Sequence, residues 1–268
     1  MITSFRMYNA GPKAAAAWRA LFDKVFADAG VDVDVIDHKF PAPIDTLWSE
    51  PDLCCAFMCG WPFARSTSGM QPIAAPIPSP PRYEGLPRYC SDFVVREESG
   101  WSALEETFGH RFGWMAANSQ SGFNAPRAHL AEYIRPDRAC LFAEVKGPLG
   151  APMTTLDALR NGEVDVVALD GFWLDLLRHH EPGRWQGLRV VASTAWTPIP
   201  LLVAAPGVSP EAIGRVRATL LALRSDAAYA PLLKGTLLTG FAPVDAGAYG
   251  VLDRMAAAAR AAGYAEIR

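Results

Sequence analysis

Short apolar segments alternate with amphipathic segments along nearly the whole chain, and this alternation is the strongest constraint on its fold. Residues 1–8, 53–58, 111–117 and 164–169 are segments of strand length rich in apolar side chains and are predicted strands. Residues 13–30 carry apolar side chains at helical spacing and end in a glycine. Continuous apolar runs are typical of strands buried on both faces, and strands separated by helices favour βαβ units. The sequence therefore predicts an α/β fold with a mainly parallel sheet.

The chain length allows one large domain or two lobes, and the pattern favours two lobes. With 268 residues, each lobe can bury a core of its own. One set of strand and helix segments precedes residue 93 and a similar set follows it, while the tail returns to helix. We therefore expect one lobe of residues 1–93 and 198–268 and a second of residues 94–197. Residues 71–87 are rich in proline, which predicts neither a regular helix nor a central strand.

Composition excludes several classes of partner. The formal net charge is −3 and no basic run is interleaved with aromatic residues, so we expect no nucleic-acid partner. Proline, glycine or charge interrupts every apolar stretch before it could span a membrane. Five cysteines without a framework spacing predict reduced thiols, and the start lacks the pattern of an export signal. As written, the chain is expected to be cytoplasmic.

The segment 114–127 carries the clearest functional pattern. An apolar strand runs into Asn118-Ser119-Gln120-Ser121-Gly122, and an amphipathic helix follows. The first N–H groups of a helix have no partner within it, and the helix dipole makes that end partly positive. Serine hydroxyls at such a site suit an oxyanion. A serine that only caps the helix is the alternative.

Acidic and aromatic residues follow other predicted strands. Asp170 ends a buried strand and opens a helix, so it is expected to cap that helix and to face a ligand. Trp61, Trp173 and Trp196 each lie just past a strand or at a helix start. At such positions a tryptophan either contacts a ligand or packs in the core between the lobes. We find no catalytic triad, metal-ligand spacing or phosphate loop, and therefore predict no catalytic residue, metal or cofactor.

Three segments resemble the phosphate/phosphonate-type (PhnD-like) solute-binding proteins of ABC transporters. Residues 89–100 resemble a strand that crosses between lobes in that family, and residues 161–170 are similar to its strand that ends in aspartate. Residues 197–204 resemble the return crossing. The resemblance implies a type II periplasmic-binding-protein fold, in which two lobes joined by two crossover strands close on a ligand by a hinge motion. It also implies a periplasmic location.

The resemblance assigns roles to particular residues. The turn from Ser119 to Gly122 would hold the oxyanion, Asp170 would meet a ligand cation or hydroxyl, and Tyr8 with residues 59–63 would line the first lobe's side. Where the family often has Gly-Ser-His, this chain has Gly-Ala-Pro at 150–152. The candidate ligand contacts are Tyr8, Gly60, Trp61, Ser119, Gln120, Ser121, Gly122, Asp170, Trp173 and Trp196.

The sequence supports three functions to different degrees. The first is a solute-binding protein that captures a phosphonate, phosphate ester or similar small anion, with an ABC transporter permease as its partner. The second is a cytoplasmic enzyme on the same fold, resembling menaquinone-pathway or thiamine-pyrimidine-synthesis proteins. The third is an intracellular ligand sensor. Fold alone does not separate them, and the missing catalytic set favours the binding protein.

Overall fold

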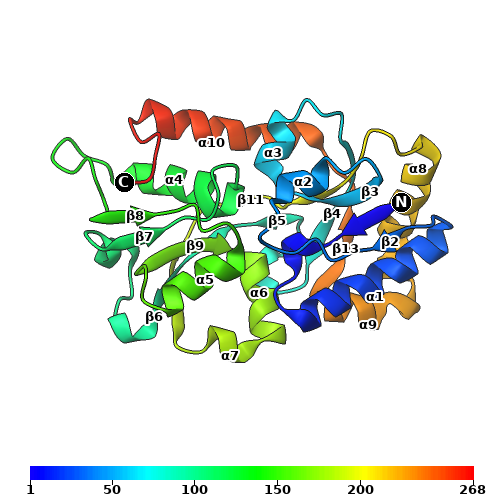
Figure 1. Cartoon of the computed structure of the whole chain (residues 1–268), viewed down its shortest axis with the longest axis horizontal. Helices are drawn as coiled ribbons and strands as arrows, with labels where there is room; N and C mark the ends of the chain where they lie inside the picture. The colour runs from blue at the N-terminus through cyan, green and yellow to red at the C-terminus, as the bar shows by residue number, and fades with distance from the viewer.

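The computed structural model describes all of residues 1–268 and contains two separate β-sheets, each with helices around it (Figure 1). The first sheet has the strand order β13-β4-β12-β3-β1-β2. Its strands are β1 (Ile2–Ser4), β2 (Asp34–Val35), β3 (Leu53–Met58), β4 (Gln71–Pro78), β12 (Leu201–Ala204) and β13 (Leu238–Ala242). Strand β1 pairs in parallel with β2 and β3, while β12 runs antiparallel between β3 and β4.

The second sheet has the strand order β10-β6-β9-β7-β8. Its strands are β6 (Ser91–Arg96), β7 (Arg111–Gly113), β8 (Glu144–Lys146), β9 (Val166–Asp170) and β10 (Leu188–Ser193). Here β7 pairs in parallel with β8 and β9, and β6 runs antiparallel to β9 and β10. The expected α/β class with two lobes is confirmed. The expectation of a mainly parallel sheet is wrong: four pairings in the two sheets are parallel and five are antiparallel, because β12, β13, β6 and β10 pair antiparallel with their neighbours.

The chain crosses between the sheets through a short antiparallel ribbon. Strand β5 (Arg88–Tyr89) pairs with β11 (Thr197–Pro198), so that Tyr89 lies opposite Thr197. These are the two crossover strands that the sequence predicted. Residues 91–93, which the sequence assigned to the first lobe, lie in β6 of the second sheet.

Helices surround both sheets (Figure 1). The first lobe carries α1 (Pro12–Ala29), α2 (Ile44–Trp48), α3 (Gly60–Arg65), α8 (Pro210–Ala222) and α9 (Ala230–Gly235), and the second carries α4 (Ala125–Leu130), α5 (Pro152–Arg160), α6 (Gly171–His180) and α7 (Pro182–Trp185). Helix α10 (Gly250–Ala261) packs against both α3 and α4. Short helical turns are η1 (Arg6–Tyr8), η2 (Pro81–Tyr83), η3 (Glu97–Ser99), η4 (Leu104–Thr107), η5 (Gln120–Asn124), η6 (Ala131–Tyr133), η7 (Leu223–Ser225), η8 (Ala227–Tyr229) and η9 (Ala246–Tyr249).

Two apolar clusters form the core. The larger has 58 buried residues and continues from the first lobe into α5, α6 and β9 of the second, where Phe172 packs edge-on against Tyr8. The smaller lies in the second lobe around Phe93 and Phe112, and it includes Tyr264 and Ile267 from the end of the chain. The C-terminal segment therefore packs on the second lobe, although the sequence placed it in the first. No helix combines the length and apolarity needed to span a membrane.

One expectation about secondary structure is wrong. Residues 71–78 form strand β4 inside the first sheet, although three of them are prolines. Strand β12 pairs with residues 71–74 and β13 with residues 75–78, with register shifts in both pairings. Because each half of β4 pairs on one side only, prolines without an N–H are tolerated there. Two expected strands are also shorter: β1 ends at Ser4 before η1, and β7 ends at Gly113.

Candidate functional site

Two adjacent cavities lie between the lobes. The inner cavity has a volume of about 90 Å³ and the outer cavity about 520 Å³. Arg6, Ala151, Pro152 and Trp173 line both cavities, so the cavities adjoin at these residues. The shared residues come from η1 in the first lobe and from the starts of α5 and α6 in the second.

Helix N-termini surround the inner cavity. Cys59, Ser119, Ala151 and Asp170 line it, and each of these residues immediately precedes a helix: α3, η5, α5 and α6 respectively. Open sheets bind ligands beyond the carboxyl ends of their strands, where such helices begin. Since the first N–H groups of each helix lack partners within it, the positive ends of these helices converge on the cavity.

The turn before η5 is built as the sequence predicted. The Ser119 Oγ accepts a hydrogen bond from the Gly122 N–H at 2.9 Å, which fixes the start of η5 and leaves the hydroxyl proton free to donate. The Gln120 N–H lies 3.3 Å from the Cys59 sulfur across the lobe boundary. Burial raises the pKa of that thiol to about 11, although backbone N–H groups of Gln120, Trp61 and Ser121 act in the opposite direction. The thiol is therefore neutral, and the turn presents hydrogen-bond donors to the cavity.

Asp170 combines a structural and a site-facing position. Its Oδ1 accepts hydrogen bonds from the N–H groups of Phe172 at 2.8 Å and Trp173 at 3.0 Å, so it caps α6. Burial raises the pKa of this carboxyl to about 7, against the effect of those two N–H donors. A group that exchanges its proton near neutral pH consequently faces the inner cavity.

Three buried hydroxyls near Asp170 have no hydrogen-bond partner in the protein. They belong to Tyr8, Tyr89 and Ser91. Ser91 lies directly opposite Asp170 in the ladder between β6 and β9. Burial raises the pKa of both tyrosines, and the charge of Asp170 contributes to each shift. Buried polar groups without partners are rare and costly, so this group of hydroxyls indicates a site for ligand or water.

Four of the ten residues chosen from the sequence line the inner cavity, and six do not. Ser119, Ser121, Asp170 and Trp173 line it. Tyr8 is buried in the aromatic core, where its ring stacks on Trp18. Gly122 supports the turn through its N–H. None of these placements tests ligand contact, which stays a prediction.

The remaining candidates serve packing around α10 and the crossover ribbon. Trp61 donates from Nε1 to Asp253 Oδ1 at 3.0 Å, which ties α3 to α10. A side chain at Gly60 would collide with Leu252, so glycine allows that close packing. The Gln120 amide pairs with Asn124 at 2.8 Å. Trp196 is 40% exposed and stacks with Arg88 outside the cavities.

Sequence reasoning missed several residues of the site. Arg6 lines both cavities, Tyr89 brings an unpartnered hydroxyl, and Ala151 precedes α5. The segment 150–152, where the family's Gly-Ser-His is missing, lines the inner cavity in this chain. The sequence contained a pattern that could have indicated Tyr89, because Tyr89 lies in the segment that resembles a crossing strand. It contained none for Arg6, which lies in the strand predicted at residues 1–8.

The fold and its cleft define a two-lobed substrate-binding protein. The family described as periplasmic substrate-binding proteins of phosphonate ABC transporters matches residues 13–249. The chain belongs to this family, whose members are substrate-binding components and not enzymes. Interaction with a small ligand and with a transporter permease follows from that membership.

Solved structures share the fold at low sequence identity. A binding-protein component of an ABC phosphonate transporter from Pseudomonas aeruginosa superposes with a TM-score of 0.80 at 16% identity, covering 98% of this chain and 87% of that one. PhnD1 from Prochlorococcus marinus, in complex with methylphosphonate, gives 0.75 at 16% identity over 96% of both chains. A Xanthomonas citri protein bound to ATP gives 0.65 at 19% identity over 99% of both chains. No curated protein matches the sequence.

Proposed function

We propose that the inner cavity captures the oxyanion head group of a phosphonate or phosphate ester, and that the two lobes close over it. The observation that carries this proposal is the set of four residues, Cys59, Ser119, Ala151 and Asp170, that line the cavity and each precede a helix. Their helices begin around one small volume, and the N-terminus of a helix is a site where phosphate binds.

The size of the inner cavity fits this ligand class. A cavity of about 150 Å³ holds one benzene molecule, so about 90 Å³ leaves room for a group smaller than a benzene ring. A tetrahedral phosphonate or phosphate head meets that limit. The methylphosphonate held by the Prochlorococcus relative belongs to the same class.

The proposed contacts divide by chemistry. Ser119 and Ser121 donate hydroxyl protons to the oxyanion. The Asp170 Oδ1 is already used in capping α6. The other carboxylate oxygen therefore accepts from a protonated oxygen, a hydroxyl or a cationic group of the ligand.

Closure of the lobes turns on the β5–β11 ribbon, with the first sheet and its helices moving against the second sheet, which begins at β6, and the C-terminal segment packed on it. One contact already joins the lobes beside the inner cavity: the Asn118 amide donates to both carboxylate oxygens of Asp45, at 2.9 and 3.0 Å. Because Asn118 belongs to the ligand-binding turn, occupation of the turn and closure are coupled.

Isothermal titration with methylphosphonate, phosphate and sulfate tests the ligand class. We expect saturable binding of at least one of them, and a loss of about tenfold or more in the Ser119→Ala/Ser121→Ala double variant. The matched control is Ser209→Ala, because Ser209 caps α8 through the Ala212 N–H away from both cavities. Equal affinity in the double variant and the wild type would remove the assigned site.

Small-angle X-ray scattering tests closure separately. We expect the radius of gyration to fall when the ligand is added. Asp45→Ala removes the contact with Asn118. It is expected to lower the affinity for the ligand and to increase the radius of gyration of the unliganded protein. A radius of gyration that does not respond to saturating ligand would contradict hinge closure while leaving the oxyanion site intact.

A further inference from the structure

The outer cavity is far larger than a simple oxyanion requires. Its volume is about 520 Å³, against about 90 Å³ for the inner cavity, and the two share Arg6, Ala151, Pro152 and Trp173. Pockets that enclose organic ligands usually measure about 300–1,000 Å³. A ligand whose head group occupies the inner cavity would therefore extend its organic part past these shared residues into the outer cavity.

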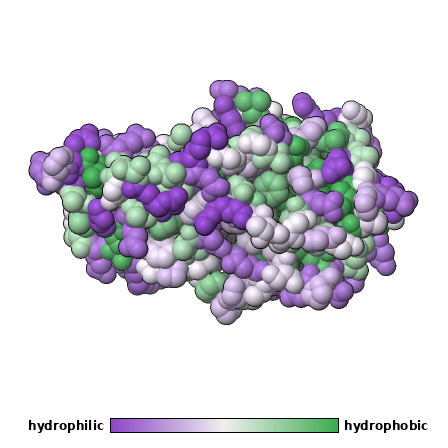
Figure 2. Space-filling model, turned by 90° about the horizontal axis from the view of Figure 1, so that it is seen from above, coloured by the Kyte–Doolittle hydropathy of each residue, from purple (hydrophilic) through white to green (hydrophobic).

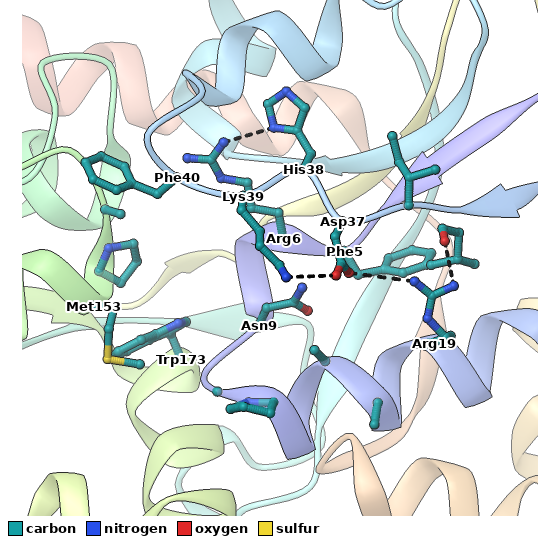
Figure 3. Close-up of a pocket in the computed structure, with 18 residues that line it drawn as sticks. Phe5, Arg6, Asn9, Arg19, Asp37, His38, Lys39, Phe40, Met153 and Trp173 are labelled. Atoms are coloured by element: carbon teal, nitrogen blue, oxygen red, sulfur yellow. Dashed lines mark hydrogen bonds and ion pairs between the residues drawn. The ribbon is translucent and has the colours of Figure 1, made fainter.

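The first-lobe side of the outer cavity is positively charged, although the chain as a whole carries −3. Three cations line the outer cavity, Arg6, Arg19 and Lys39, against the single carboxylate of Asp37. Asp37 is shared between Lys39 at 3.2 Å and Arg19 at 3.7 Å. Figure 3 shows these charged side chains gathered on one side of the cavity. One carboxylate cannot neutralise them all, and a positive excess remains.

Arg6 is the cation of these three that has no carboxylate partner. Its Nη1 lies 2.9 Å from His38 Nδ1 and also donates to the carbonyl oxygen of Ala42. When His38 Nδ1 accepts this hydrogen bond, neither partner of Arg6 carries a negative charge. Partial burial lowers the pKa of Arg6, which shows that its charge is incompletely solvated. Such an arginine forms a stronger, charge-assisted hydrogen bond when a ligand anion replaces one of its neutral partners.

Backbone dipoles add to the positive potential. Helices α1 and α5 both begin at the outer cavity, which Pro12 and Pro152 line. Neither helix has an acidic residue in its own first turn. The Glu181 side chain lies beside Gly11 at the start of α1, so the positive end of α5 contributes more to this potential than that of α1. The opposite side is apolar, with Phe40, Met153 and Trp173 facing the charged group across the cavity (Figure 3).

We propose that the outer cavity is a second subsite that binds an acidic substituent, so that the chain selects phosphonates or phosphate esters whose organic part ends in a carboxylate or a second phosphate. In this arrangement Arg6 and Lys39 meet the second anion, and Trp173 with Met153 covers the carbon chain between the two charged ends. The proposal rests on the proposed function, because it requires the head group to occupy the inner cavity.

Three related probes test it by isothermal titration: methylphosphonate, propylphosphonate and 3-phosphonopropionate. The last two have the same length and differ only by a methyl or a carboxylate at the far end. We expect 3-phosphonopropionate to bind about fivefold to tenfold more tightly than propylphosphonate, the effect of one partly solvated ion pair. This ratio should fall as salt is added.

Two substitutions must move that ratio in opposite directions. Lys39→Gln removes a cation and lowers the preference for 3-phosphonopropionate, whereas Asp37→Asn removes the carboxylate that competes with the ligand and raises it. Both side chains are largely exposed, so the fold is expected to tolerate both changes. Arg215→Gln removes a cation from α8, outside both cavities, and should leave the ratio unchanged.

The outcomes separate the two proposals. Binding of methylphosphonate without a preference between the two longer probes overturns the second anionic subsite and leaves the proposed function standing. Equal gains for propylphosphonate and 3-phosphonopropionate over methylphosphonate identify an apolar subsite and likewise overturn it. If none of the three probes binds, the phosphonate function fails and the second subsite fails with it.

Discussion

The Arg82 guanidinium lies 2.9 Å from Asp92 Oδ2, and the two residues stand on opposite sides of the first crossing between the lobes. Asp92 is completely buried in β6. Arg82 also donates to Asp175 of α6 at 3.0 Å and to the carbonyl oxygen of Gly171 at 2.6 Å. One arginine thus joins the segment before β5 to the helix whose capping residue, Asp170, faces the ligand cavity.

We expect Arg82→Ala to lower the free energy of unfolding by about 3 kcal/mol, because it leaves the Asp92 carboxylate buried without its cation. Arg82 is 31% exposed, so the loss falls at the lower end of the range for buried pairs. Urea denaturation monitored by tryptophan fluorescence measures it. Arg215→Ala breaks an exposed pair with Glu211 on α8 and should change stability by less than about 0.5 kcal/mol. Similar values for the two variants would contradict a structural role for Arg82.

Asp170 gives the apoprotein a distinctive dependence of stability on pH. Burial raises the pKa of Asp170 to about 7 in the folded protein, whereas an unfolded aspartate has a pKa near 3.9. Between these values the folded protein retains a proton that the unfolded chain has released. Stability contributed by this group therefore falls as pH rises from about 4 to about 7, and is constant above that window.

The Asp170→Asn variant tests this dependence, since asparagine can still accept the N–H groups of Phe172 and Trp173. Subtracting its unfolding free energy from that of the wild type should give a difference that declines across the window. Asp165→Asn is the control: a hydrogen bond from Arg111 is the main cause that lowers the pKa of Asp165 to about 2. The stabilising effect of the Asp165 carboxylate is lost only as pH falls from about 4 towards 2. The difference in unfolding free energy between the wild type and Asp165→Asn should therefore stay constant above pH 4. A decline of this difference above pH 4 would contradict the assignment of the pH dependence to Asp170.

The parts of the site that the sequence predicted are those fixed by local rules. Ser119 and Asp170 each follow a strand and cap the next helix, and both lie at the inner cavity. Trp61 and Trp196 occupy comparable positions in the sequence, but the direction of their side chains depends on partners far along the chain. Trp61 bonds to Asp253 and Trp196 packs against Tyr83, contacts that no local pattern encodes.

The same limit applies to the outer cavity and to strand β4. The outer cavity combines residues from η1, α1, the segment 35–40 and α5, so it exists only once the lobes are placed. Proline content argued against a central strand at residues 71–78. What permits it is the division of pairing between β12 and β13, a property of the assembled sheet.

Gly122 and Gly214 are both helical glycines, and alanine is expected to act on them with opposite signs. A Cβ at Gly122 would lie 2.6 Å from the Met115 Cβ, whereas nothing lies within 4 Å of one at Gly214. Gly122→Ala should therefore displace the oxyanion turn, destabilise the protein by about 1–3 kcal/mol and weaken ligand binding. Gly214→Ala, inside α8, should stabilise it by up to about 1 kcal/mol. Calorimetric melting of both variants tests this, and a stabilised Gly122→Ala protein would contradict the packing of the turn.

The cysteines provide a chemical test of how the inner cavity is built. Cys140 is exposed and the other four are buried, and burial raises the pKa of Cys59 to about 11. Since thiolates react and thiols do not, a disulfide reagent at neutral pH should modify one thiol rapidly in the folded protein and all five in denaturant. Cys140→Ser should abolish the rapid phase. Cys59 lines the inner cavity, so its slow modification in that variant should become slower still when a ligand fills the cavity. A rate of Cys59 modification that saturating ligand leaves unchanged would place the ligand elsewhere.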